Sequence, residues 1–209
     1  MVENRENITE GLKGNLLAGN LLADLLVNLP KPFDLDSVKV ASERLKENCA
    51  ENKDVLQLIT GTEEIKQTAE SIFGNSPFLS DIILKNPEYF SSFFEVINAN
   101  KKQQTKLCFD DRFNELISDI AKYETKITDE KAKKELYKFL RKGKQKAALL
   151  IGLAEILKFW SIEESTEKLS QFADICVIKA TEFLFAKNHK DGVIELTNED
   201  DPLKDCGFI

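Results

Sequence analysis

The longest helical pattern in this chain reads TDEKAKKELYKFLRKGKQKAALLIGLAEILKF and runs from Thr128 to Phe159. Its apolar residues recur every three or four positions, the spacing that places side chains on one side of an α-helix. They are Leu136, Phe139, Leu140, Ala147, Leu150, Ile151, Ala154 and Leu157. We expect Thr128 to cap this helix, because its hydroxyl can accept a hydrogen bond from the first turn. Gly143 and Gly152 each cost about 1 kcal/mol relative to alanine inside a helix, which indicates close packing or a kink.

Shorter helical patterns precede this segment. Residues 16–29 carry a leucine row at every fourth position, and Pro30 and Pro32 stop that pattern. The expected caps that follow are Asp34 or Asp36, Thr62, Ser76 before Pro77, and Asn86 before Pro87. Gly74 is expected to end one of these helices as a C′ glycine. A polar connector is expected over residues 98–106, and aromatic residues from Phe73 to Phe94 are interpreted as core.

The last helix is expected to open at a capping box formed by Ser161 and Glu164. Its inward residues are expected to be Leu169, Phe172, Ala173, Cys176, Ala180 and Leu184. From Asn188 the helical pattern of the sequence ends. A turn is expected at 189–192, a short strand at 193–196 and an acidic loop after it. The chain then stops on an apolar run with strand character, Cys206–Ile209, which suggests that it is cut there.

Composition sets the class of protein. The 209 residues include 29 Lys and Arg against 36 Asp and Glu, a net charge of −7, with only 9 Gly and 5 Pro. This balance fits a mainly α globular protein and argues against general nucleic-acid binding. The N-terminus does not resemble a signal peptide, and no stretch reaches the roughly 18–20 apolar residues of a membrane span. We therefore expect a cytoplasmic protein with no nucleic-acid or membrane partner.

Few residues are arranged for chemistry. The four cysteines lie far apart and there is one histidine, so the sequence predicts no metal site. Neither a phosphate-binding P-loop nor a G-x-G-x-x-G turn is present. Asp34 with Asp36, and Asp110 with Asp111, are interpreted as residues that precede helices and cap them. The residues thus identify no catalytic group.

A basic run within the longest pattern is the exception. Its members are Lys131, Lys133, Lys134, Lys138, Arg141, Lys142, Lys144 and Lys146. One interpretation is a solvated face, supported by the nearby Glu130 and Glu135. The other is a helix that faces a phosphate or an acidic partner. Aromatic residues at stacking spacing are missing beside it, so single-stranded nucleic acid fits poorly.

Two stretches resemble a known family. The first, FGNSPFLSDIILKNPEYF over residues 73–90, is similar to the "G-x-S-P-F-L … P-E" signature of bifunctional glutamine synthetase adenylyltransferase/adenylyl-removing enzymes. The second, LRKGKQKAALLI over residues 140–151 followed by LSQFAD over 169–174, resembles that family's "L-R-x-x-K/R" and "L-[ST]-x-x-A-[DE]" helices. Order and spacing both agree, and the resemblance extends from about residue 30 onward.

The resemblance implies a fold and an activity. The fold would be mainly α, the helical N-terminal region of a polymerase-β-like nucleotidyltransferase domain, truncated at its first β-strand. Its divisions would be an N-terminal helical region (1–127), two long helices (128–187), and a linker with the first catalytic strand (188–209). The family's "S-D-x-D" aspartates match nothing here, so no catalytic or metal-binding residue is carried over. Arg141 and Lys144 are the candidates to bind phosphate or a partner, although lysines at 144 and 146 where relatives often carry arginine weaken a tight phosphate clamp.

The implied function is regulation of nitrogen assimilation. This stretch would belong to the adenylyl-removing half of the enzyme and would be inactive alone. Glutamine synthetase, a PII-type signalling protein, ATP or ADP, phosphate and Mg²⁺ are the implied partners and cofactor of the full enzyme. The alternative is a non-catalytic helical module that binds an acidic protein through the Lys131–Lys146 face.

Overall fold

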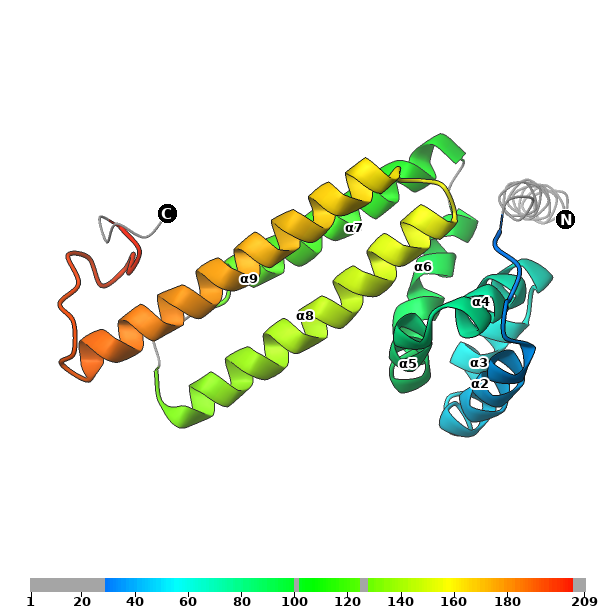
Figure 1. The fold of residues 1–209 in the computed structure, drawn as a ribbon, viewed down its shortest axis with the longest axis horizontal. Helices are drawn as coiled ribbons and strands as arrows, with labels where there is room; N and C mark the ends of the chain where they lie inside the picture. Colours follow the sequence, from blue (N-terminus) through cyan, green and yellow to red (C-terminus); the bar gives the residue numbers. More distant parts are fainter. Residues whose placement is uncertain (1–28, 100–101, 125–127, 205–209) are drawn as a thin grey trace, which may run out of the picture. The chain divides into compact units, whose positions relative to one another are not determined.

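A computed structural model describes residues 29–99, 102–124 and 128–204, and these residues form helices and connections without a strand. The helices are α2 (Leu35–Asn48), α3 (Lys53–Thr60), α4 (Glu63–Asn75), α5 (Pro77–Lys85), α6 (Pro87–Ala99), α7 (Lys102–Ala121), α8 (Glu130–Ile156) and α9 (Ile162–Lys190) (Figure 1). The mainly α class is therefore confirmed. The expected leucine-rich helix at 16–29 and the apolar ending at 206–209 lie outside the described residues.

The chain divides into two compact units. The first takes residues up to 110 together with 148–165, and the second takes 111–147 together with residues from 166 on. In the first unit, α4 packs against α2, α3 and α5, and α6 packs against α3 and α5. In the second unit, α8 contacts both α7 and α9 at Gly143. A Cβ added to this glycine would lie 3.2 Å from Ile120 Cδ1 of α7 and 3.7 Å from the Phe172 ring of α9.

Aromatic side chains fill the core of the first unit. Phe90 and Phe94 are fully buried with ring centroids 4.9 Å apart. Phe109 stacks on Phe93 at 6.0 Å and lies 5.1 Å from Phe159. The interpretation of the aromatic stretch as core is confirmed at these positions, but Phe78 is an exception because 55% of it is exposed.

Helix starts follow the expected local chemistry. The Asp34 carboxylate accepts from the Ser37 N–H at 3.0 Å and thus caps α2. The Thr62 hydroxyl accepts from the Ile65 N–H at 3.4 Å at the start of α4. Ser76 caps α5, with Pro77 at its first position. These three caps are confirmed.

The capping box of α9 is confirmed as well. The Ser161 N–H donates to the Glu164 carboxylate at 2.8 Å, and the Glu164 N–H donates to the Ser161 hydroxyl at 3.2 Å. The second carboxylate oxygen of Glu164 binds the Lys106 ammonium at 2.5 Å. This pair joins the start of α7 to the start of α9 inside the first unit.

The expected role of Gly74 is wrong. Gly74 is buried within the last turn of α4 and does not take a positive φ, since Gly192 is the glycine with one among the described residues. Its missing side chain instead admits Pro32, because an added Cβ would lie 2.6 Å from Pro32 Cβ. The residues from Pro30 to Asp34, which we call the 30–34 segment, thereby lie directly on α4.

Three expectations near α7 and α8 also need correction. Asp110 and Asp111 lie in the middle of α7 and do not precede a helix, because α7 already begins at Lys102, within the expected polar connector. At the start of α8 the Asp129 carboxylate accepts from the Ala132 N–H at 2.7 Å, so Asp129 caps this helix and Thr128 does not. Thr128 is buried instead.

The expected strand at 193–196 is wrong. The N–H groups of Val193 and Ile194 donate to the Asn188 carbonyl at 2.9 and 3.4 Å, and the Leu196 N–H donates to Nδ1 of His189 at 3.3 Å. These bonds fold the chain back on the end of α9, and they occupy the backbone donors that a sheet would use.

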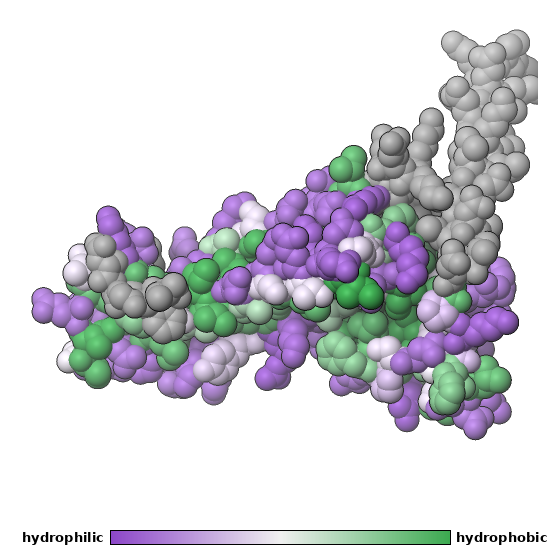
Figure 2. Space-filling model, turned by 45° about the horizontal axis from the view of Figure 1, so that its top comes forward, coloured by the Kyte–Doolittle hydropathy of each residue, from purple (hydrophilic) through white to green (hydrophobic). Residues whose placement is uncertain are grey.

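The surface of the described residues is not uniformly polar. Figure 2 shows hydrophobic patches between hydrophilic residues on the face in view. Several large apolar side chains are exposed, including Phe33, Leu35, Ile162, Leu169, Val177 and Leu184. In α9 the expectation that Leu169, Ala173 and Leu184 face inward is therefore wrong, whereas Phe172 is buried as expected.

Candidate functional site

The basic face of α8 is the candidate site that the sequence predicted. We define it as the exposed cations Lys134, Lys138, Arg141, Lys142 and Lys144. Lys134, Lys138 and Lys142 follow one another at every fourth position, and Arg141 lies three residues from both Lys138 and Lys144. Because residues three and four apart are neighbours on a helix, their charges form one surface.

The opposite side of α8 fixes this orientation. Leu136, Gly143 and Ala147 repeat at seven- and four-residue spacing and are all buried. A Cβ added at Gly143 would lie only 3.2 Å from Ile120 Cδ1 and in van der Waals contact with Phe172, so neighbouring side chains pack closely on this glycine. This close packing in the second unit holds α8 in one rotational setting. Arg141, Lys142 and Lys144 are therefore directed to solvent.

Ion pairs neutralise two lysines at the start of the helix. Lys131 lies 4.0 Å from Glu135, and Lys133 lies 3.9 Å from Glu130. Within the described residues, no acidic group lies within 4.0 Å of a nitrogen of the five basic-face side chains. Uncompensated cations on one surface attract anions, and this attraction weakens as salt concentration rises.

The two candidate residues, Arg141 and Lys144, therefore lie together and exposed. Arginine can bind a carboxylate or phosphate through two parallel hydrogen bonds, whereas lysine acts as a point charge. What they bind stays a prediction.

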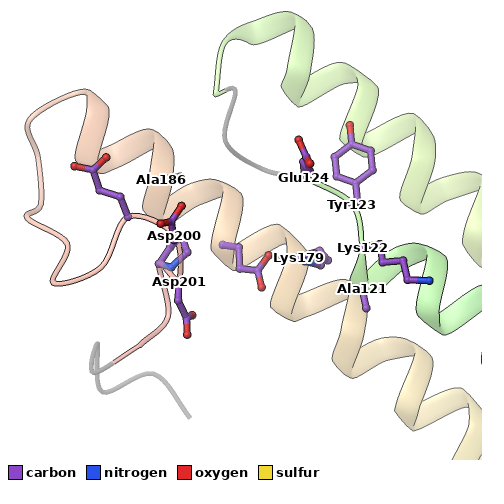
Figure 3. A pocket seen from close by; sticks show the side chains of 11 residues that line it. Ala121, Lys122, Tyr123, Glu124, Lys179, Ala186, Asp200 and Asp201 are labelled. Atoms are coloured by element: carbon purple, nitrogen blue, oxygen red, sulfur yellow. Dashed lines mark hydrogen bonds and ion pairs between the residues drawn. The ribbon is translucent and has the colours of Figure 1, made fainter.

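A pocket of ≈ 220 Å³ in the second unit was not predicted. Lys122, Tyr123 and Glu124 line it from the segment after α7, and Asp200 and Asp201 from the loop after α9 (Figure 3). Its lining also includes Lys179, Glu182, Ala186, Glu199, Ala121 and Pro202. The mixture of two lysines and five carboxylates makes this pocket net acidic.

Lys179 is the unusual residue of this pocket. It is 9% exposed and its ammonium lies 2.9 Å from the Glu182 carboxylate. One sequence signal could have revealed it: Lys179 follows the buried Phe172 by seven residues and precedes the buried Phe183 by four, so it occupies a core-facing position of α9. A buried lysine needs such a partner, because an unpaired charge is costly away from water.

Magnesium, which the family resemblance implies for the full enzyme, does not fit the described residues. Among them, no three Asp, Glu, His or Cys side chains come together in a way that could hold a metal ion. Both carboxylate oxygens of Asp34 are bound by Ser37, at 3.0 Å to its N–H and 2.7 Å to its hydroxyl. Asp34 and Asp36 are thus part of a helix start.

Comparisons with known proteins support the family resemblance that was noted for residues 73–90, 140–151 and 169–174. A family model described as glutamate-ammonia ligase adenylyltransferase matches residues 66–205. The bifunctional glutamine synthetase adenylyltransferase/adenylyl-removing enzyme of Bartonella henselae is 33% identical over 136 residues, which cover 64% of this chain and 12% of that protein. The enzyme of the same description from Brucella suis is 35% identical over 75 residues, 36% of this chain and 8% of that protein. The one from Idiomarina loihiensis is 29% identical over 136 residues, 65% of this chain and 13% of that protein.

An α-helical protein with these blocks in this order is thus part of a nucleotidyltransferase family. The chain belongs to the glutamate-ammonia ligase adenylyltransferase family. The stretch that it shares with these curated relatives spans only 8% to 13% of their length. No solved structure matches the chain. Among the described helices, none is both long and apolar enough to cross a lipid bilayer.

Proposed function

We propose that this chain is a segment of the enzyme that adenylylates and de-adenylylates glutamine synthetase, and that it belongs to the adenylyl-removing half. The observation that carries the proposal is the family match over residues 66–205. The signature residues inside it also have structural roles: Gly74 admits Pro32, Ser76 caps α5 and Pro77 occupies its first position.

In the proposed reaction, phosphate attacks the adenylyl phosphorus on a glutamine synthetase tyrosine, the bond to the tyrosine oxygen breaks, and ADP leaves. Among the described residues no carboxylate cluster could hold Mg²⁺ for this chemistry, and the sequence matches none of the family's "S-D-x-D" aspartates, so we expect the chain alone to be inactive. Its contribution is positioning, with Arg141 and Lys144 binding phosphate oxygens. A PII-type signalling protein would regulate the full enzyme, and the reaction would take place in the cytoplasm.

The test of inactivity is direct. Adenylylated glutamine synthetase is incubated with the 209-residue chain, phosphate and Mg²⁺, and released ADP is measured. We expect no ADP above the level of a reaction without the chain. Turnover would refute the statement that the catalytic carboxylates lie outside these residues.

Anion binding by the basic face can be measured separately. Calorimetry with ATP and with inorganic phosphate should detect binding that falls as salt is added, because exposed charges are screened. Replacing Arg141 and Lys144 by glutamate should abolish it. A matched control replaces Lys39 and Lys46, two exposed lysines of α2, by glutamate and changes the net charge equally. If both double variants lose binding alike, the interaction reflects overall charge and the assignment to Arg141 and Lys144 is wrong.

A second candidate function is a non-catalytic module that binds an acidic protein through the Lys131–Lys146 face. The observation that favours it is the length of this row of basic residues, because the exposed Lys134, Lys138 and Lys142 span more of α8 than one phosphate group requires. Poly-L-glutamate serves as the probe. This candidate predicts that poly-L-glutamate binds and that millimolar phosphate does not displace it. Displacement by phosphate at low concentration would instead favour a phosphate site.

A further inference from the structure

A stripe of apolar side chains lies along α9 and is exposed at every position except the half-buried Ala180. We define the α9 stripe as Leu169, Ala173, Val177, Ala180 and Leu184. Successive members are four, four, three and four residues apart, so they follow one side of the helix. Leu169 is 50% exposed, Val177 56% and Leu184 48%. The stripe covers about 22 Å of helix at 1.5 Å per residue.

The stripe is distinct from the side of α9 that packs in the second unit. That side carries Phe172, Lys179 and Phe183, which are all buried. The charged residue that continues the stripe toward the helix end, Lys187, is paired with Asp191 at 2.6 Å. No charged side chain interrupts the stripe between Leu169 and Leu184 on that side. Such an uninterrupted apolar surface is typical of an interface.

The order of residues in the stripe is symmetric about its middle. Leu169 and Leu184 lie equally far from the point between Cys176 and Val177, and so do Ala173 and Ala180. If two copies of α9 are laid antiparallel, each Leu169 meets Leu184 of the other copy and each Ala173 meets Ala180. A two-fold interface brings one surface patch against its own copy, and this order of residues pairs leucine with leucine and alanine with alanine across the axis.

Residue sizes suit the same arrangement. Alanines at the two inner positions let helix axes approach closely, while leucines at both ends fill the widening gaps of a crossed helix pair. Val177, next to the midpoint, would meet its own counterpart. From this symmetry we propose that the α9 stripe binds a second copy of this chain in an antiparallel, two-fold arrangement.

The association is weak. One helix pair of this length buries less than the roughly 1,600 Å² of a standard interface. The expected dissociation constant is therefore in the micromolar range or above, and the chain is a monomer when dilute. This inference concerns self-association and is independent of the proposed enzymatic role.

The first experiment measures mass against concentration. Light scattering and sedimentation of the 209-residue chain, from about 5 to about 500 µM, should show the mass rising from 23.7 kDa toward twice that value. Leu184→Glu should raise the dissociation constant about tenfold or more, because it places a carboxylate in an apolar contact. Ile178→Glu is the matched control: Ile178 is 41% exposed on α9 but lies nine residues, two and a half turns, from Leu169 and so on the other side of the helix.

The second experiment tests the antiparallel geometry. In a background with Cys49→Ala, Cys108→Ser, Cys176→Ala and Cys206→Ser, single cysteines are introduced and oxidised. Val177→Cys should cross-link with itself. Leu169→Cys and Leu184→Cys should each fail to cross-link alone but should cross-link when mixed.

Several results would overturn the proposal. A monomer at every concentration would mean that the stripe does not bind a second copy. Self-cross-linking of Leu169→Cys would indicate a parallel pair. Equal loss of association in Leu184→Glu and Ile178→Glu would place the interface elsewhere. Circular dichroism of each variant tests whether the helices are retained, and this separates a lost interface from unfolding.

Discussion

Replacing Gly74 by alanine should detach the 30–34 segment from α4. The added Cβ would lie 2.6 Å from Pro32 Cβ, 2.9 Å from Pro32 Cα and 3.2 Å from the Asp34 carbonyl oxygen. A proline ring and a backbone carbonyl cannot rotate away as the end of a leucine can. The segment must therefore move as a whole, or α4 must shift.

The magnitude follows from what is lost and gained. Four hydrogen bonds hold the segment: Asp34 N–H to the Gly74 carbonyl at 3.1 Å, Ser71 hydroxyl to the Pro30 carbonyl at 2.5 Å, and two between Asn75 and the backbone of Lys31 and Phe33 at 2.9 and 3.2 Å. Such bonds contribute about 1 kcal/mol each, and overpacking costs about 1–3 kcal/mol. Alanine returns about 1 kcal/mol of helix preference. Detachment loses all four bonds, about 4 kcal/mol, against this gain, so we expect a net destabilisation of about 3 kcal/mol.

Urea unfolding followed by fluorescence measures this change. The single tryptophan, Trp160, belongs to the same unit as Gly74 and is buried. Gly152→Ala is the matched control, because its added Cβ would meet only the movable end of Leu79, at 2.8 Å, and should change stability by no more than about 1 kcal/mol. If Gly74→Ala is as stable as the parent chain or more stable, the close approach of Pro32 does not explain this glycine.

Three further changes are predicted. Lys158 has a φ of 60°, while the N–H groups of the two residues after it bond the Ala154 carbonyl, so Lys158→Gly should stabilise the chain by about 1 kcal/mol in the same unfolding assay. Hydrogen bonds from the Ser37 side chain and backbone lower the pKa of Asp34. The Asp34 cap therefore stabilises α2 fully above the ordinary aspartate pKa, and this stabilisation is lost as the pH falls through the lowered value. Asp34→Asn should reduce this loss of helix in acid, as measured by circular dichroism. Burial, and secondarily Glu88, raises the pKa of the Cys49 thiol, so maleimide should label Cys49 only on unfolding, as peptide mapping would show; rapid labelling of the folded chain would contradict its burial.

Helix starts could be predicted from sequence because a cap is a local interaction. Asp34 needs only Ser37, three residues away, and Ser161 needs only Glu164. The buried row of α8 could be predicted for a similar reason, since its opposite side carries almost only charged residues. At these positions one side of the helix is clearly apolar and the other clearly polar.

Where a helix has apolar residues on two sides, spacing cannot decide which side is buried. In α9, Leu169 and Leu184 follow a helical repeat as regular as that of Phe172, yet the leucines are exposed. The choice depends on contacts with α7 and α8, which are distant in sequence. The expected role of Gly74 was wrong for a related reason, because its contact Pro32 lies 42 residues earlier in the sequence. Lys179 was missed because its charge argues for an exposed position, although its spacing from Phe172 and Phe183 places it on the core-facing side, where it pairs with Glu182.

The basic face of α8 and the α9 stripe belong to the same unit but rely on different forces, so they can be separated by experiment. Charge reversal at Arg141 and Lys144 should remove salt-sensitive anion binding and leave the dimer constant unchanged. Leu184→Glu should do the opposite, because apolar contact is not screened by salt. If the two surfaces are independent, the variant that combines Leu184→Glu with charge reversal at Arg141 and Lys144 should show the same change in each binding free energy as the separate variants, within about 0.5 kcal/mol. A larger coupling would show that anion binding and self-association share one surface, and the two assignments could then not both hold.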